Sequence, residues 1–221
     1  MIEWNWEYSL EILPALIKAL RVTVFATFVG MSLALFLGLL LALGRRSRFR
    51  ILSLPVSGFI EFVRTTPLLV QLYFLFYVLP NYGILLSPFE AGFIGLGVHY
   101  STYLSEVYRA GIEAVPREQW EAATALNFSW KKTWTRIILP QTVPPMLPVF
   151  GNYLIAMFKE TPLLAAITVI ELLETAKTFG DITFQYLEPF TIVGLLFLVL
   201  SYSSALIIRR LEGRFVKNPG T

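Results

Sequence analysis

The stretch AVPREQWEAATALNFSWKKTWTRIILPQ, residues 114–141, is charged and lies between long apolar segments. Pro116 suits the first position of a helix, because that position does not need the N–H group that proline lacks. The helix continues through EQWEAATAL, and we expect Asn127 to end it, since asparagine tolerates the left-handed backbone conformation. Ser129 can then cap a second helix, WKKTWTRIIL. We therefore predict two helices joined by a sharp corner, in a loop larger than a connection between two membrane spans requires.

The rest of the chain has the composition of a membrane protein. Of its 221 residues, 56% are hydrophobic and only 15% are charged, and the mean hydropathy is +0.64. Soluble domains carry about 25% charged residues. Residues 22–43 and 189–208 contain no charged side chain, and each segment can cross roughly 30 Å of hydrocarbon as a helix. The predicted fold class is an all-α polytopic membrane protein.

About five membrane spans are expected. They cover residues 22–43, 56–79, 89–110, 141–158 and 189–208. The third span is unusually polar, and the fourth is expected to be broken by Pro144, Pro145 and Pro148. Residues 162–184, between the last two spans, have an apolar half too short to cross a bilayer. We interpret them as a re-entrant or interfacial helix packed on the bundle.

The distribution of basic residues predicts the orientation. Most of the 18 lysines and arginines follow the first, third or fifth span, in residues 45–50, 109–136 and 209–217. Five spans with the N-terminus outside place all three clusters in the cytoplasm, as the positive-inside rule requires. Because the positive charge flanks spans and forms no basic face, we expect no nucleic-acid partner.

The two ends of the chain are expected to lie on opposite sides of the membrane. Residues 1–18 are acidic and contain Trp4, Trp6 and Tyr8, which favour a periplasmic segment at the membrane interface. They lack the basic region of a signal peptide. Residues 212–221 are expected to form a cytoplasmic tail.

The stretch EAATALNFSWKKTWTRIILPQ resembles the EAA signature loop of ATP-binding-cassette importer permeases. The segments EFVRTTPLLVQL, EVYRAGIEAVPREQWEAA and NYLIAMFKETPL are similar to the polar amino-acid subfamily. The resemblance spans residues 19–211 and implies a type I importer transmembrane domain, with residues 114–141 as its coupling loop. It also implies a helix that docks in a groove of the cytoplasmic ATPase. The implied contact residues are Gln119, Trp120, Glu121, Ala122, Ala123, Ala125, Leu126 and Asn127.

The same resemblance implies the partners. These are a cytoplasmic ATPase dimer, a second permease subunit that is identical or related, an extracytoplasmic solute-binding protein and the lipid of the cell (inner) membrane. No Gly-Lys dipeptide occurs, so the chain has no P-loop. We therefore expect no enzymatic activity, catalytic residue, metal site or cofactor in this chain, with ATP and Mg²⁺ on the ATPase. Three positions depart from the subfamily pattern: Asn127 and Thr65 replace glycine, and Pro162 replaces serine.

Polar side chains within the spans are candidates for the substrate pathway, because intramembrane charge costs about 2.5–3.5 kcal/mol on insertion scales. The candidates are Glu61, Arg64, Thr65, Gln71, His99, Tyr100, Glu106, Asn152 and Glu160. Glu61 and Arg64 are three residues apart and can form an ion pair. The segment 65–67 is expected to interrupt the second span.

Two of these candidates have a purely structural alternative. His99, the one histidine of the chain, can form a hydrogen bond between two helices or line a polar cavity. Glu106 can hold a substrate ammonium group or pair with Arg109. Tyr73, Tyr77 and Tyr100 offer aromatic faces to a cation.

Three classes of function were weighed. The first is the permease subunit of an ATP-driven importer. An intramembrane enzyme is disfavoured, since one histidine excludes HExxH and the absence of cysteine excludes a thiol nucleophile. An ion-coupled carrier or channel subunit is compatible with Glu61 and Glu106, but five spans show no inverted repeat.

Within the importer class, the substrate has two alternatives. The segments LPNYGILLSPFEAG and HYSTYLSEVYRAGIEAVPREQWEAATAL are similar to permeases for ectoine and hydroxyectoine, which are zwitterionic compatible solutes. A conventional polar amino acid (glutamine, glutamate, histidine or arginine) is the alternative.

Overall fold

The computed structural model describes residues 4–215, and this part of the chain consists of helices and short connections without a strand, which confirms the all-α prediction. Residues 216–221, most of the predicted tail, lie outside the described residues. The α-helices are α1 (Trp6–Arg45), α2 (Arg50–Thr65), α3 (Leu68–Tyr73), α4 (Pro88–Glu113), α5 (Arg117–Ala125), α6 (Trp130–Thr133), α7 (Leu139–Glu160), α8 (Leu172–Thr183) and α9 (Leu187–Phe215). Short π and 3₁₀ turns occupy Phe74–Val78, Leu79–Tyr82, Trp134–Ile138 and Thr161–Ile167.

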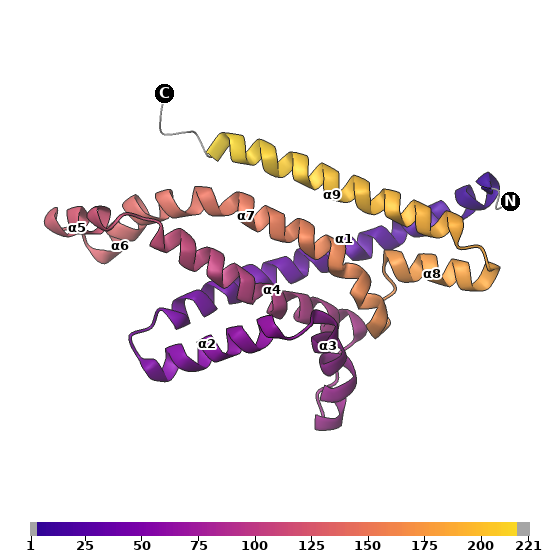
Figure 1. Cartoon of the computed structure of the whole chain (residues 1–221), viewed down its shortest axis with the longest axis horizontal. Coiled ribbons are helices and arrows are strands. Elements are labelled where there is room, and N and C mark those ends of the chain that lie inside the picture. Colours follow the sequence, from indigo (N-terminus) through magenta and orange to yellow (C-terminus); the bar gives the residue numbers. More distant parts are fainter. Residues whose placement is uncertain (1–3, 216–221) are drawn as a thin grey trace.

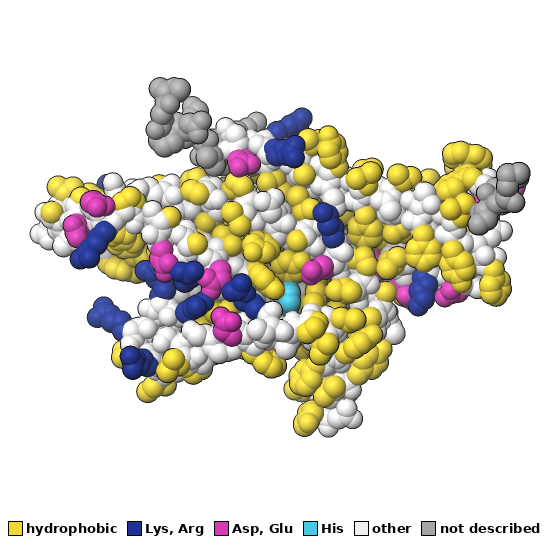
Figure 2. Space-filling model, in the orientation of Figure 1, with side chains coloured by type: hydrophobic (Ala, Val, Ile, Leu, Met, Phe, Trp, Pro, Cys, Tyr) yellow, Lys and Arg dark blue, Asp and Glu magenta, His cyan; other side chains and the backbone are white. Residues whose placement is uncertain are grey.

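The long helices α1, α7 and α9 run along the long axis of the molecule (Figure 1). The α1–α2 turn, α5, α6 and the C-terminal end of α9 lie toward one end, while the N-terminus and α8 lie at the other. Figure 2 shows most of the visible Lys and Arg side chains over the first of these ends and over the centre. Hydrophobic side chains cover much of the remaining face.

Helix α1 is longer than the predicted first span. It begins after Asn5, whose side chain accepts a hydrogen bond from the Tyr8 N–H at 3.1 Å. It continues for 40 residues, about 60 Å, without a break at residue 18. Its first turns pack on α8 and α9, because Tyr8, Ile12 and Leu16 are buried in a cluster with residues of those two helices.

Helix α4 is the central helix, in contact with α1, α2, α3 and α7. Its approach to α1 depends on glycine. A Cβ atom on Gly38 would lie 2.9 Å from the Ser101 carbonyl oxygen, and one on Gly97 would lie 2.6 Å from Leu33 Cδ2. Small residues of this kind let membrane helices pack backbone to backbone.

Length and hydropathy identify two clear membrane spans in the described residues, α1 and α9. Two bent pairs, α2 with α3 and α7 with α8, bring the number to four. The polar helix α4 has the length of a span but is not apolar enough to be counted. On these criteria the described residues give two to four spans, and the predicted five are reached only by including α4.

The predicted interruption of the second span is confirmed. Helices α2 and α3 meet at a 106° bend. Thr66, the residue between α2 and Pro67, is extended at φ −101° and ψ 140°, as a residue before proline prefers. The segment after the bend projects from the bundle as an arm (Figure 1).

The prediction that prolines break the fourth span is wrong. Helix α7 is continuous from Leu139 to Glu160. Pro140, Pro144 and Pro148 are spaced by four residues, so their missing N–H groups fall on one face. Pro145 removes a further N–H group about 100° away, and the remaining hydrogen bonds keep the helix continuous. The π turn at Trp134–Ile138 also widens the helix before the first of these prolines. After a 51° bend, α8 packs on α1 and α9, as expected of a helix packed on the bundle.

The close α1–α4 contact predicts that Gly38→Ala destabilises the protein. The added methyl group meets backbone, so the helices must separate, and overpacking of this kind costs about 1–3 kcal/mol. A fall of several degrees is expected in the unfolding temperature, measured in detergent by intrinsic tryptophan fluorescence. Gly194→Ala is the control, since nothing lies within 4 Å of its added Cβ. Equal melting of the two variants would show that the contact does not limit packing.

Candidate functional site

The predicted corner in the polar loop is present. Helix α5 starts directly after Pro116, one residue later than expected, and ends at Ala125. Asn127 has φ +57°. The Phe128 N–H donates to the Ala123 carbonyl at 3.0 Å, and the Asn127 N–H donates to the Thr124 carbonyl at 2.9 Å. This pair of hydrogen bonds is the Schellman motif that closes a helix C-terminus, so asparagine replaces glycine here without loss of the turn.

The second helix of the loop is joined directly to α7. The Ser129 hydroxyl accepts a hydrogen bond from the Lys132 N–H at 3.4 Å, which confirms the predicted cap. Helix α6 then passes through the π turn into α7. The Trp120 ring of α5 packs edge-on against Trp134 of that turn, with centroids 5.5 Å apart. Helix α5 is therefore connected to α7 both through the corner and through an aromatic contact.

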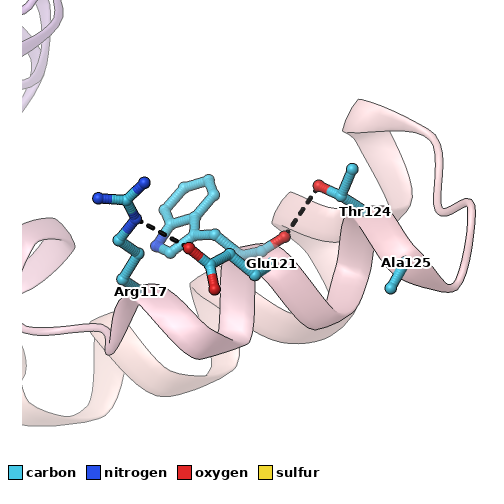
Figure 3. Close-up of a pocket in the computed structure, with 5 residues that line it drawn as sticks. Arg117, Glu121, Thr124 and Ala125 are labelled. Atoms are coloured by element: carbon cyan, nitrogen blue, oxygen red, sulfur yellow. Dashed lines mark hydrogen bonds and ion pairs between the residues drawn. The ribbon is translucent and has the colours of Figure 1, made fainter.

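Part of α5 faces solvent around a shallow pocket of about 490 Å³. Its lining includes Arg117, Glu121, Thr124 and Ala125, which Figure 3 shows along one side of the helix. The Arg117 Nε donates to a Glu121 carboxylate oxygen at 2.9 Å.

The other predicted contact residues divide between surface and interior. Gln119, Ala122 and Asn127 are exposed, and Leu126 has an exposed fraction of 68%. Trp120 is half-buried and Ala123 is buried, so these two side chains support the loop from inside.

Gln71 forms hydrogen bonds at the bend between α2 and α3 and links this bend to His99 of α4. The Gln71 amide nitrogen donates to the Val63 carbonyl at 2.8 Å and to the Thr66 carbonyl at 3.1 Å. Its amide oxygen lies 3.2 Å from His99 Nδ1 on α4. Thr65 donates its hydroxyl to the Glu61 carbonyl at 2.8 Å. These contacts satisfy carbonyl groups freed by the bend, and they give His99 the helix-bridging role.

An aromatic cluster lies beside this break. The rings of His99, Tyr100, Tyr103 and Tyr153 have centroid separations between 5.2 and 6.2 Å. The Arg64 guanidinium carbon is 5.1 Å from the Tyr103 centroid. The Glu160 carboxylate lies close to Tyr100. One Glu160 oxygen, Oε2, is buried without a hydrogen-bond partner in the described residues.

Three arginines converge on Glu106. Arg45 of α1 contacts one carboxylate oxygen, which Arg64 of α2 approaches at 3.9 Å. Arg109 lies 2.8 Å from the other carboxylate oxygen of Glu106 and also forms an ion pair with Glu113. The predicted Glu106–Arg109 pair is confirmed. The predicted Glu61–Arg64 pair is absent from the described residues, because the Arg64 guanidinium is directed to Glu106 of α4 instead.

The structure thus gathers five predicted pathway residues around the aromatic cluster: Arg64, Gln71, His99, Tyr100 and Glu160. Glu106 lies with the arginines, Thr65 bonds within its own helix, and Glu61 and Asn152 are exposed. Sequence analysis missed Arg45, which had been counted only as a charge flanking a span. It also missed Tyr153. Arg45 is 61 residues from Glu106, so no local spacing could have revealed their contact.

The convergence on Glu106 predicts that Glu106→Gln destabilises the helix bundle. The substitution leaves three half-buried guanidinium groups facing one another, a loss of about 1–3 kcal/mol. Glu113→Gln, which removes one exposed ion pair, is expected to cost less than about 1 kcal/mol. Thermal unfolding of both variants in detergent measures the difference. A Glu113→Gln variant as unstable as Glu106→Gln would contradict the central position of Glu106.

Residues 34–217 match the family described as "Binding-protein-dependent transport system inner membrane component". The chain is 44% identical over 202 residues to "Probable amino-acid ABC transporter permease protein y4tG" of Sinorhizobium fredii, covering 91% of this chain and 87% of that protein. It is 34% identical over 204 residues to "L-cystine transport system permease protein TcyB" of Bacillus subtilis, covering 90% of this chain and 87% of that protein.

Two solved structures have the same fold. "Crystal structure of an amino acid ABC transporter with histidines" has a TM-score of 0.90 at 30% identity, over 96% of this chain and 100% of that one. A chain of the MetNI methionine ABC transporter has a TM-score of 0.74 at 17% identity, over 97% of this chain and 100% of that one. The chain therefore belongs to the binding-protein-dependent inner membrane transport components, as an amino-acid ABC transporter permease subunit with the type I importer fold that is not itself the ATPase.

Proposed function

We propose that this permease moves a zwitterion with an amino-acid-like pair of charges, and that the aromatic cluster beside Glu160 is its binding site. The main support is the buried Glu160 Oε2, which has no hydrogen-bond partner in the described residues. A buried carboxylate oxygen without a donor is costly, and a substrate ammonium or amidinium group would supply one. Tyr100 and Tyr153 add faces that attract a cation.

The substrate carboxylate is proposed to bind Arg64. This guanidinium is only loosely held, 3.9 Å from Glu106 and 5.1 Å from the Tyr103 centroid, whereas a direct pair with a carboxylate is shorter and stronger. The site then offers one negative and one positive group across an aromatic wall. That arrangement fits ectoine and hydroxyectoine, and it fits a conventional polar amino acid equally well.

We propose that α5 docks on a cytoplasmic ATPase dimer, which supplies the energy together with ATP and Mg²⁺. The remaining proposed partners are a second permease, identical or related, and an extracytoplasmic solute-binding protein. The three basic clusters face the cytoplasm in this arrangement and the N-terminus faces outward. The support is geometric, since the α1–α2 turn, α5 and the end of α9 lie toward one end of the molecule.

The docking proposal predicts that Glu121→Lys abolishes ATP-driven uptake while the protein remains inserted in the membrane. The substitution breaks the ion pair with Arg117 and reverses the charge beside the pocket on α5. Membrane content and capture of the ATPase by the tagged permease are measured alongside uptake. Glu118→Lys is a matched charge reversal elsewhere on α5. Normal capture of the ATPase and normal uptake by Glu121→Lys would refute this docking surface.

The function itself is tested by uptake into proteoliposomes that contain this chain, its ATPase, its partner permease and its binding protein. Labelled ectoine is compared with glutamine, glutamate, histidine and arginine, with and without ATP. We expect ATP-dependent uptake of a zwitterion, reduced at least tenfold by Glu160→Gln. Uptake of ectoine supports the compatible-solute alternative, and uptake restricted to an amino acid excludes it. Uptake driven by an ion gradient without ATP would instead indicate a carrier.

A further inference from the structure

A groove of about 640 Å³ lies between α1 and α2. Its walls are apolar: Leu37, Leu40 and Leu41 line one side, and Leu52, Val56 and Phe59 line the other. Leu40 and Leu41 lie three and four residues after Leu37, and Leu52, Val56 and Phe59 are four and three residues apart, so each set forms a stripe on its helix. Leu40 and Leu52 each have an exposed fraction of 49%, which shows that the groove opens on the molecular surface.

The groove extends to a strongly basic turn. Ser47 of the α1–α2 turn belongs to the groove lining, and Arg46, Arg48 and Arg50 are exposed on either side of it. In the described residues none of these three arginines has a carboxylate within 4.0 Å, whereas their neighbour Arg45 turns to Glu106. The first turn of α2 also lacks an acidic residue, so nothing in this region of the chain offsets the positive charge.

The turn also carries apolar side chains on its surface. Phe49 and Ile51 have exposed fractions of 76% and 92%. Arginines that alternate with exposed apolar residues are typical of a segment at the boundary between lipid headgroups and acyl chains. A ligand of this region therefore has an anionic end at the turn and an apolar end in the groove.

We propose that the groove binds one acyl chain of an anionic phospholipid, and that Arg46 and Arg48 bind its phosphate. Basic sites between membrane helices on the cytoplasmic side recognise such headgroups. A second copy of this chain fits less well. A twofold contact through the same face would bring one arginine cluster against another.

The test is native mass spectrometry of the detergent-purified permease with its ATPase, titrated with phosphatidylglycerol or with phosphatidylcholine of the same acyl chains. We expect tighter binding of phosphatidylglycerol. Arg46→Gln with Arg48→Gln is expected to weaken it about 25-fold, since each arginine near a membrane surface contributes about fivefold. Arg209→Gln with Arg210→Gln is the matched control, because it removes two exposed arginines at the end of α9 and is expected to change binding less than twofold.

A second variant separates the groove from the charge. Leu52→Trp fills the groove, leaves every arginine in place and is expected to weaken binding of both lipids at least fivefold. The proposal is overturned if the arginine variant binds like the control, if the two lipids bind equally, or if Leu52→Trp has no effect. It is also overturned if Val56→Cys, in a chain that otherwise has no cysteine, crosslinks two copies, because a second permease then occupies the groove.

Discussion

The close contact of α1 with α4 is the constraint on which the other helices depend. Because Gly38 and Gly97 let the two backbones approach, α4 is enclosed by protein rather than by lipid. Its polar side chains can then be buried at little cost, since Ser101 and Thr102 donate their hydroxyls to carbonyls of their own helix at 2.6 and 2.7 Å. The helix with the weakest membrane signature is thus the centre of the bundle, while the strongly apolar α9 lies largely exposed at its edge.

A polar contact then joins the broken α2–α3 unit to α4, where Gln71 reaches His99. Arg64 of α2 approaches Glu106 of α4 more loosely, at 3.9 Å. Both contacts lie on the polar part of α4 that the glycine packing protects. Non-helical backbone at membrane depth is stable only where protein or water satisfies it, and the Gln71 amide does so directly. The aromatic cluster beside it is therefore held by a scaffold in which the carbonyls at the bend have partners.

Local rules predicted the parts of the structure that depend on neighbouring residues. The left-handed Asn127 and the cap by Ser129 follow from the chemistry of single side chains, and both are present. The prolines of α7 do not break the helix, because Pro140, Pro144 and Pro148 share one face and Pro145 adds only one further lost hydrogen bond. Tyr8 was expected at a membrane interface because tyrosine is enriched there. Its burial against α8 and α9 depends on segments more than 160 residues away, which a single sequence does not place.

Helix α7 links the two halves of the proposed mechanism. Its first residue follows the π turn that holds Trp134 against Trp120 of α5, and its last residue is Glu160. The helix is continuous over this distance, about 33 Å, so a displacement of α5 moves Glu160 relative to Tyr100 rather than being absorbed within α7. Tyr100 belongs to α4, whose most extensive packing is on α1 rather than on α7. On the proposed function, closure of the ATPase therefore shifts Glu160 and Tyr153 of α7 relative to Tyr100 and Tyr103 of α4, which weakens binding of the substrate cation at the step in which energy is supplied.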